Sequence, residues 1–374
     1  MINFWSYKEE YNKYGKLYLK EINKTIKKGD IFFGNQIKKF EKKFIQLNKG
    51  KYGIAVGSGT DALLIALKTL KLKPGDEIIT AVNTAIPTIS AIINAGGTPR
   101  LVDVGKDYLI DVNKIQKEIN KKTKAIIPVH LYGQMCNMKV ITKIARKNKL
   151  IIIEDCAQSQ GAKYKNKYSG TIGKFGCFSF YPTKILGAYG DGGFIITNDL
   201  AAYKQIKRLR FYGIETVDNN KFKNLYYAQE NGLNSRLDEI QATILNLKLR
   251  KINYFIKKRR KLAKSYIKKL YKTDLNLPIE NKDCIHAYHL FTISHPKANI
   301  IKDKLKQFKI EARTIYPFLI SEMNAYKNLN IYKNKFNNAK KYAKEIFSLP
   351  LYPELNKSKI NYICKTLVKI LKEI

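Results

Sequence analysis

An acid and a lysine, each following an apolar segment, could form the centre of a covalent reaction site. Asp155 comes directly after the strand-like run Leu150–Glu154, and open α/β sheets bind ligands at the carboxyl ends of their strands. Lys184 follows a second expected strand, Cys177–Phe180, and Pro182 interrupts that strand so that the lysine lies on a turn. A desolvated lysine is the side chain that forms imines with carbonyl compounds.

Each of these two residues also has an ordinary explanation. An aspartate at a strand end commonly forms a turn or caps a helix, and a lysine is usually an exposed charge. Two observations favour a buried Lys184 instead. Four glycines lie between Gly187 and Gly193, and apolar strands are expected on both sides of the lysine.

A third element adds a possible phosphate site. Gly57-Ser58-Gly59-Thr60-Asp61 joins the expected strand Tyr52–Val56 to a helix that begins near Asp61. Small residues at a helix start allow backbone N–H groups and a hydroxyl to contact a phosphate, although Ser58 or Thr60 could equally be a helix cap. Together the three elements supply a phosphate site, an acid for a ring nitrogen and an imine lysine, which are the groups that pyridoxal phosphate requires.

The elements that must position these residues alternate along the chain. Short apolar runs and helix-period segments follow one another over the first two hundred residues, which predicts an α/β fold. A long helix pattern then extends from about Leu237 to about Leu270. After it come a strand at His286–Ser294 and helices at Asn299–Phe308 and Lys357–Leu371. We therefore expect a large domain over residues 1–250 and a smaller α+β domain over residues 251–374.

The charge suggests an anionic partner at first sight. Seventy Lys and Arg residues against thirty Asp and Glu give a formal net charge of +40. The excess is mostly lysine, spread from Lys8 to Lys372 and accompanied by abundant Ile, Asn and Tyr, as a bias toward AT-rich codons would produce. Nucleic-acid binders usually concentrate arginine and aromatic residues in one stripe, so the charge favours a solvated surface over a nucleic-acid site.

The remaining composition argues against disulfide-rich, metal-binding, membrane and secreted proteins. Five cysteines without a CxxC pair argue against a disulfide framework, and no carboxylate or cysteine cluster beside His286 and His289 completes a metal site. No run reaches the length of a membrane helix, and the charged residues among the first fifteen do not form a signal peptide. We expect no metal, no membrane association and a cytoplasmic location.

The sequence resembles the DegT/DnrJ/EryC1/StrS family of sugar aminotransferases over nearly its whole length. Four segments carry the resemblance in the family's order: Glu154–Gln158, Ser179–Lys184, Gly190–Gly193 and Asn234–Ala242. The resemblance implies fold type I of the pyridoxal-phosphate enzymes, which has a large domain with a mostly parallel sheet flanked by helices and a smaller C-terminal α+β domain.

The resemblance also implies a role for individual residues. Lys184 would hold the cofactor as an imine, Asp155 would pair with its ring nitrogen, and Gln158 would lie near its ring hydroxyl. The phosphate would be held by Gly59, Thr60 and Ser179. In this family the segment that matches Asn234–Arg236 reaches the cofactor of the neighbouring subunit, so Asn234 and Arg236 would complete a shared active site in a homodimer.

The resemblance further implies a substrate class. L-Glutamate would donate the amino group to a nucleotide-linked keto-sugar in a glycan or surface-polysaccharide pathway. The stretches Tyr181–Lys184 and Gly187–Gly193 are more similar to members that act on 3-keto sugars, which favours a dTDP-3-keto-6-deoxyhexose and a dTDP-3-amino-3,6-dideoxyhexose product. The alternatives are a UDP-linked or 4-keto sugar, a free aminocyclitol precursor, or, in another class, a non-catalytic regulator that binds pyridoxal phosphate or nucleic acid.

Three departures from the family pattern affect the substrate side. Ala85 stands where many relatives have an aromatic residue over the cofactor ring, so another group must cover that face. The usual His-Tyr-Pro appears as Ile315-Tyr316-Pro317, and the segment Phe318–Met323 lacks the usual His and Gln. A branch of the family with dehydratase activity has histidine in place of the lysine, and Lys184 argues against that branch.

Overall fold

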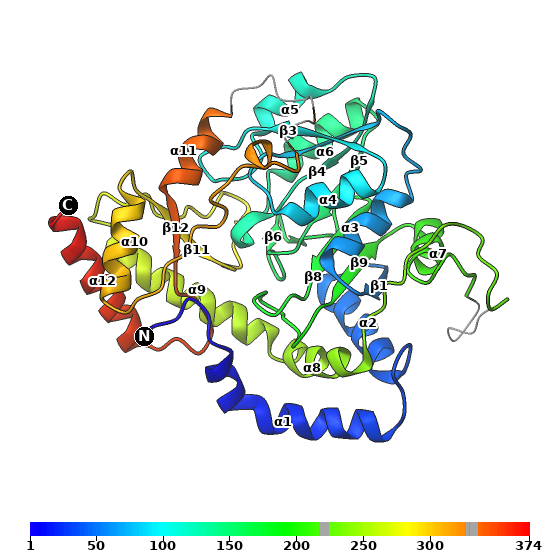
Figure 1. Cartoon of the computed structure of the whole chain (residues 1–374), viewed down its shortest axis with the longest axis horizontal. Coiled ribbons are helices and arrows are strands. Elements are labelled where there is room, and N and C mark those ends of the chain that lie inside the picture. The colour runs from blue at the N-terminus through cyan, green and yellow to red at the C-terminus, as the bar shows by residue number, and fades with distance from the viewer. Residues whose placement is uncertain (217–223, 327–328, 330–335) are drawn as a thin grey trace.

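The computed structural model describes residues 1–216, 224–326, 329 and 336–374, and a seven-stranded sheet forms its centre (Figure 1). The strand order is β1-β9-β8-β5-β4-β2-β3. Its strands are β1 (Tyr52–Val56), β2 (Glu77–Ala81), β3 (Thr98–Val102), β4 (Thr123–Ile127), β5 (Ile151–Asp155), β8 (Phe175–Ser179) and β9 (Gly193–Thr197). β9 is antiparallel to both its neighbours, β1 and β8, and the other pairs are parallel. The prediction of an α/β fold with a mostly parallel sheet is confirmed.

Helices cover both faces of this sheet because successive strand residues point to opposite sides. In β1, Ile54 and Val56 join the cluster that contains the apolar residues of α3 and α4, whereas Ala55 joins the cluster that contains Phe40 and Phe44 of α2. The helices are α1 (Tyr7–Lys27), α2 (Asn35–Asn48), α3 (Gly59–Lys68), α4 (Ile86–Asn94), α5 (Val112–Glu118), α6 (Met138–Lys147), α7 (Leu200–Leu209), α8 (Glu239–Leu249), α9 (Ile252–Leu270), α10 (Ala298–Gln307), α11 (Asn337–Glu345) and α12 (Lys357–Lys372).

The long helix expected from Leu237 to Leu270 is wrong in one respect: it consists of two helices, α8 and α9, separated at Arg250 and Lys251. The two helices differ in how much of their surface is buried. Most residues of α8 are buried, and this helix packs against α1 and α2, whereas α9 is amphipathic and packs against α12 (Figure 1). The break at Arg250 and Lys251 thus lies where the neighbours change from α1 and α2 to α12.

The C-terminal part has its own apolar cluster. The strands β11 (Phe291–Ser294) and β12 (Ile346–Leu349) pair antiparallel. Apolar residues of α9, α10 and α12 pack around them in a cluster whose buried members run from Leu262 to Ile370. The strand expected at His286–Ser294 is therefore shorter than predicted. A further small sheet joins β6 (Lys163–Tyr164) and β7 (Lys167–Tyr168) with β10 (Cys284–Ile285). In the described part of the chain, no helix has the length and apolar character that crossing a membrane would require.

Candidate active site

A cavity of about 450 Å³ lies at the carboxyl ends of the parallel strands. Six of the eight predicted site residues line it together: Gly59, Thr60, Asp155, Gln158, Ser179 and Lys184. The topology explains this meeting, because β5 ends at Asp155, the neighbouring parallel strand β8 ends at Ser179, and α3 begins at Gly59. The carboxyl ends of adjacent parallel strands lie at the same edge of a sheet, where α/β proteins bind ligands.

The carboxylate of Asp155 is buried and held by two donors. Its Oδ2 accepts a hydrogen bond from Thr88 Oγ1 at 2.8 Å, and its Oδ1 accepts one from the Ala157 backbone N–H at 3.1 Å. Burial raises the pKa of Asp155, whereas the two hydrogen bonds and the nearby Lys184 ammonium act in the opposite direction. The side chain is thus oriented toward the cavity as an acceptor that can share a proton with a ligand.

Lys184 lies on the turn that the sequence predicts. Its backbone N–H donates to the carbonyl of Tyr181 at 2.8 Å, just beyond Pro182. Desolvation lowers the pKa of the Lys184 amine from 10.5 to about 8, and the negative charge of Asp155 partly opposes this change. A substantial share of the amine is therefore neutral, and hence nucleophilic, near pH 8.

The start of α3 forms a close-packed cradle against β8. A Cβ atom added to Gly59 would lie 2.6 Å from the Cβ of Ser179, so no larger residue fits there without a shift of the strand. Ser58 caps the helix by accepting from the Asp61 N–H at 3.1 Å. As the first residues of the helix, Gly59 and Thr60 present N–H groups that have no acceptor within it, and such groups attract a phosphate.

Gln158 is fixed by groups on both sides of its amide. Its Oε1 accepts from the Tyr132 N–H at 2.8 Å, and its Nε2 donates to the Tyr316 hydroxyl at 3.0 Å. Tyr316 and Thr88 line the cavity but were not among the predicted site residues. Thr88 lies in the first turn of α4, and it shares a hydrogen bond of 2.9 Å with Thr84, which precedes the helix. The sequence contained no local signal that joined Thr88 to Asp155 or Tyr316 to Gln158.

Asn234 and Arg236 do not line this cavity. Asn234 is exposed, and the guanidinium of Arg236 lies 4.3 Å from the centre of the Phe32 ring. Between them, Ser235 supports the cradle: its hydroxyl accepts from the Gly57 N–H at 2.9 Å and donates to Asp61 Oδ2 at 2.8 Å. The segment therefore packs against the cradle of its own chain, and Asn234 and Arg236 lie outside the cavity.

One group of potential metal ligands occurs among the described residues: His130, Glu154 and Cys156. Glu154 already accepts from the backbone N–H groups of Gly170, Ile172 and Gly173, and it lies 2.9 Å from His130 Nε2. This network ties the end of β5 to the following loop and so holds Asp155 in place. Both carboxylate oxygens of Glu154 thus already have hydrogen-bond partners within the protein.

The model of the DegT/DnrJ/EryC1/StrS aminotransferase family matches residues 12–368. The chain belongs to this family. The dTDP-3-amino-3,4,6-trideoxy-alpha-D-glucose transaminase of Micromonospora megalomicea subsp. nigra is 35% identical over 357 residues, which are 94% of each protein. The UDP-N-acetyl-3-dehydro-alpha-D-glucosamine 3-aminotransferase of Acidithiobacillus ferrooxidans is 35% identical, over 94% of this chain and 92% of the relative. The solved structure of DesV from S. venezuelae, in complex with a ketimine intermediate, has a TM-score of 0.94 and 30% identity, over 100% of this chain and 99% of DesV.

Members of the DegT/DnrJ/EryC1/StrS family are pyridoxal-phosphate-dependent aminotransferases, and this chain is an aminotransferase. The residues of the cavity fit that cofactor. A glycine permits close approach to the phosphate cradle, a buried carboxylate can accept from a protonated ring nitrogen, and a desolvated amine can attack an aldehyde. Lys184 and Asp155 thus face one cavity beside a helix start, as the cofactor requires.

Proposed function

We propose that this protein transfers an amino group from L-glutamate to a nucleotide-linked 3-keto sugar, with pyridoxal phosphate bound at Lys184. The single observation that carries this proposal is the meeting of Lys184, Asp155 and the Gly59–Thr60 cradle around one cavity. The amino-sugar names of the relatives support the substrate class.

The chain's own residues divide the work between binding and proton transfer. Pyridoxal phosphate, when bound, supplies an aldehyde that combines with amines and a ring that withdraws electrons. Asp155 would keep a proton on the ring nitrogen by accepting it at a carboxylate that Thr88 and Ala157 orient. Lys184 Nζ would attach the cofactor and, once displaced by the donor's amine, would carry a proton between donor and cofactor.

Two observations favour a dTDP-3-keto-6-deoxyhexose as the acceptor. The family resemblance of the segment that carries Lys184 implies amination at carbon 3, and the names of both relatives place the amino group at that carbon. The relatives differ in nucleotide, dTDP in one and UDP in the other. A UDP-linked acceptor is therefore the second candidate.

The first test is spectroscopic. The purified protein with pyridoxal phosphate should have a visible absorption band that L-glutamate removes and that a keto-sugar nucleotide then restores. We expect restoration by 3-keto sugar nucleotides at a rate at least about tenfold above that of 4-keto sugar nucleotides, since a misplaced reacting carbon costs rate. Absence of the band even with added cofactor would contradict the enzyme assignment and would favour a non-catalytic, nucleic-acid-binding regulator.

We further propose a homodimer in which Asn234 and Arg236 complete the neighbouring subunit's site. Both lie outside their own chain's cavity, and three exposed apolar side chains that line it, Ile86, Tyr181 and Phe318, are available for a second copy to cover. Two inactive variants, Lys184→Ala and Arg236→Ala, should therefore complement one another when they are unfolded together and refolded. Random pairing should restore about a quarter of the wild-type activity, because half of the dimers contain one intact site of two. Activity no higher than that of either variant alone would contradict sharing.

The lowered pKa of Lys184 predicts how attachment of the cofactor depends on pH. Since only the neutral amine attacks the aldehyde, the rate at which cofactor-free protein captures pyridoxal phosphate covalently should rise about tenfold per pH unit below pH 8 and level off above it. Stopped-flow absorption would measure the rate from pH 6 to pH 11. A rate that keeps rising to pH 10.5, the ordinary range of lysine, would show that the amine is not desolvated.

A further inference from the structure

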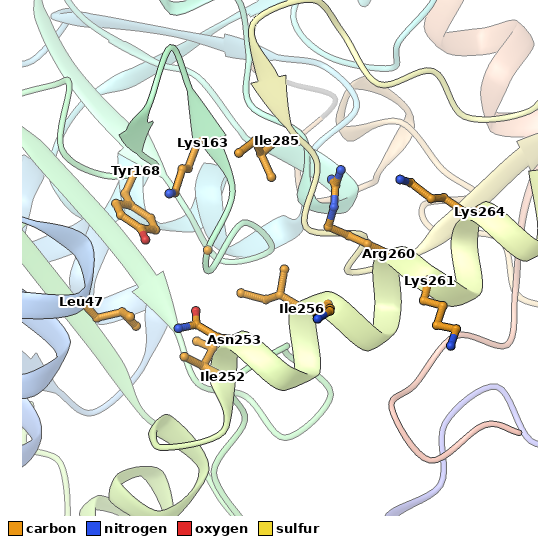
Figure 2. A pocket seen from close by; sticks show the side chains of 12 residues that line it. Leu47, Lys163, Tyr168, Ile252, Asn253, Ile256, Arg260, Lys261, Lys264 and Ile285 are labelled. Atoms are coloured by element: carbon orange, nitrogen blue, oxygen red, sulfur yellow. The ribbon is translucent and has the colours of Figure 1, made fainter.

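A second cavity, of about 530 Å³, lies between α9 and the β6–β7 hairpin, next to β10 (Figure 2). Figure 2 shows Lys163 and Tyr168 of the hairpin across the cavity from Asn253 and Ile256 of α9. None of the residues that line this cavity lines the cavity at Lys184. It is thus a separate place on the molecule.

The side chains around this second cavity carry charge of one sign. Its lining contains five cations and no acid; the cations are Lys163, Lys257, Arg260, Lys261 and Lys264. Arg260 pairs with Glu280 at 2.7 Å, but none of the ion pairs in the described part of the chain involves the four lysines. Another surface cavity, beside Asp107, Asp111 and Asp283, differs from it in that it mixes lysines with acids.

Three of the lysines repeat along one face of α9. Lys257, Lys261 and Lys264 are four and three residues apart, so they lie on one face of the helix, and all three are exposed. Like charges at this spacing repel, and an anion between them would relieve the repulsion. The arrangement therefore favours a ligand with more than one negative charge.

The floor of the second cavity is apolar. Leu47, Ile252 and Ile256 line it, Ile285 lies at its edge, and the Tyr168 ring has Lys163 Nζ 4.3 Å from its centre. A purely inorganic anion would leave this apolar surface in contact with water. A ligand with a flat ring next to its phosphates would cover the floor with the ring and meet the lysines with the phosphates.

We propose that this second cavity binds a nucleoside diphosphate group at a site separate from the cavity at Lys184. The ring of the nucleoside lies against Ile252, Ile256 and Tyr168, and the diphosphate lies between the hairpin lysine and the α9 lysines. A volume of about 530 Å³ suits a ligand of this size. The proposal does not depend on the catalytic chemistry, since it concerns binding alone.

Calorimetric titration of the cofactor-loaded protein with dTDP tests the proposal. We expect two classes of site per chain in the wild type. The variant Lys257→Gln/Lys261→Gln/Lys264→Gln should weaken one class at least about tenfold and leave the other unchanged. The matched control Lys268→Gln/Lys269→Gln/Lys272→Gln removes the same charge from exposed lysines that do not line the cavity, and it should change neither class by more than about twofold.

A second variant and a second ligand test whether dTDP binds in this cavity or is only attracted by the general positive charge of the surface. Ile285→Glu places one negative charge at the cavity edge, where Ile285 is partly exposed, and it should weaken the same class about as much as the triple variant. Inorganic pyrophosphate should bind at least about tenfold more weakly than dTDP, because it leaves the apolar floor uncovered. The proposal is overturned if no class of dTDP site is weakened by the triple variant, if the triple variant and its control weaken binding equally, or if pyrophosphate binds as tightly as dTDP.

Discussion

Replacement of Lys184 by alanine is expected to reduce amino transfer by roughly 10⁴-fold and to abolish covalent attachment of pyridoxal phosphate. The variant loses both the nucleophile that attaches the cofactor and the proton carrier that faces Asp155 in the same cavity. The fold should persist, since Lys184 lies on a turn and its backbone N–H, which donates to the Tyr181 carbonyl, is kept in the variant. Turnover with L-glutamate and a 3-keto sugar nucleotide measures the loss, and borohydride reduction followed by mass spectrometry measures the attachment.

Two controls test whether the loss of activity is specific to the amine of Lys184. Lys204→Ala removes an exposed lysine of α7 and should leave both readouts unchanged. A small primary amine added to the Lys184→Ala protein should restore part of the turnover, because it can carry the proton that the missing side chain carried. Covalent attachment that persists in the Lys184→Ala variant would place the reactive lysine elsewhere in the chain.

Asp155→Asn is expected to lower turnover by about 10² to 10³-fold while the shape of the cavity is kept. The amide cannot hold a proton on the ring nitrogen as the carboxylate does, and the loss of one preorganised charge at a reacting group has this order of effect. A second effect follows from the same charge. Asp155 raises the pKa of Lys184, so its removal should lower that pKa further and shift the pH dependence of cofactor capture to lower pH.

The pH shift separates an electrostatic role of Asp155 from a merely structural one. Thr88→Val removes one hydrogen bond to Asp155 but leaves the charge; it should lower turnover by about tenfold or less and leave the capture profile near that of the wild type. An Asp155→Asn variant that keeps its turnover, or whose capture profile does not move, would show that the carboxylate does not act on the cofactor or on the lysine.

The sequence alone determined the fold class, the family and the residues at the ends of the strands. Apolar runs identified β5 and β8, and Asp155 at the end of β5 and Lys184 shortly after β8 are near these strands whatever the rest of the chain does. The cradle at Gly59 was similarly local, because a strand, a turn of small residues and a helix follow one another directly. Short-range order of this kind is visible in a sequence because backbone geometry and hydrophobic periodicity act over a few residues.

Only the tertiary structure decided which residues from distant parts of the sequence contact these residues. Thr88 lies 67 positions before Asp155, and Tyr316 lies 158 positions after Gln158, yet both pairs are hydrogen-bonded. The break between α8 and α9 depends on which helices lie beside each half, and the lysines of α9 become part of a cavity only because the β6–β7 hairpin folds against them. Such contacts depend on the packing of segments far apart in the chain, and no local pattern of residue types encodes the partner on the other side.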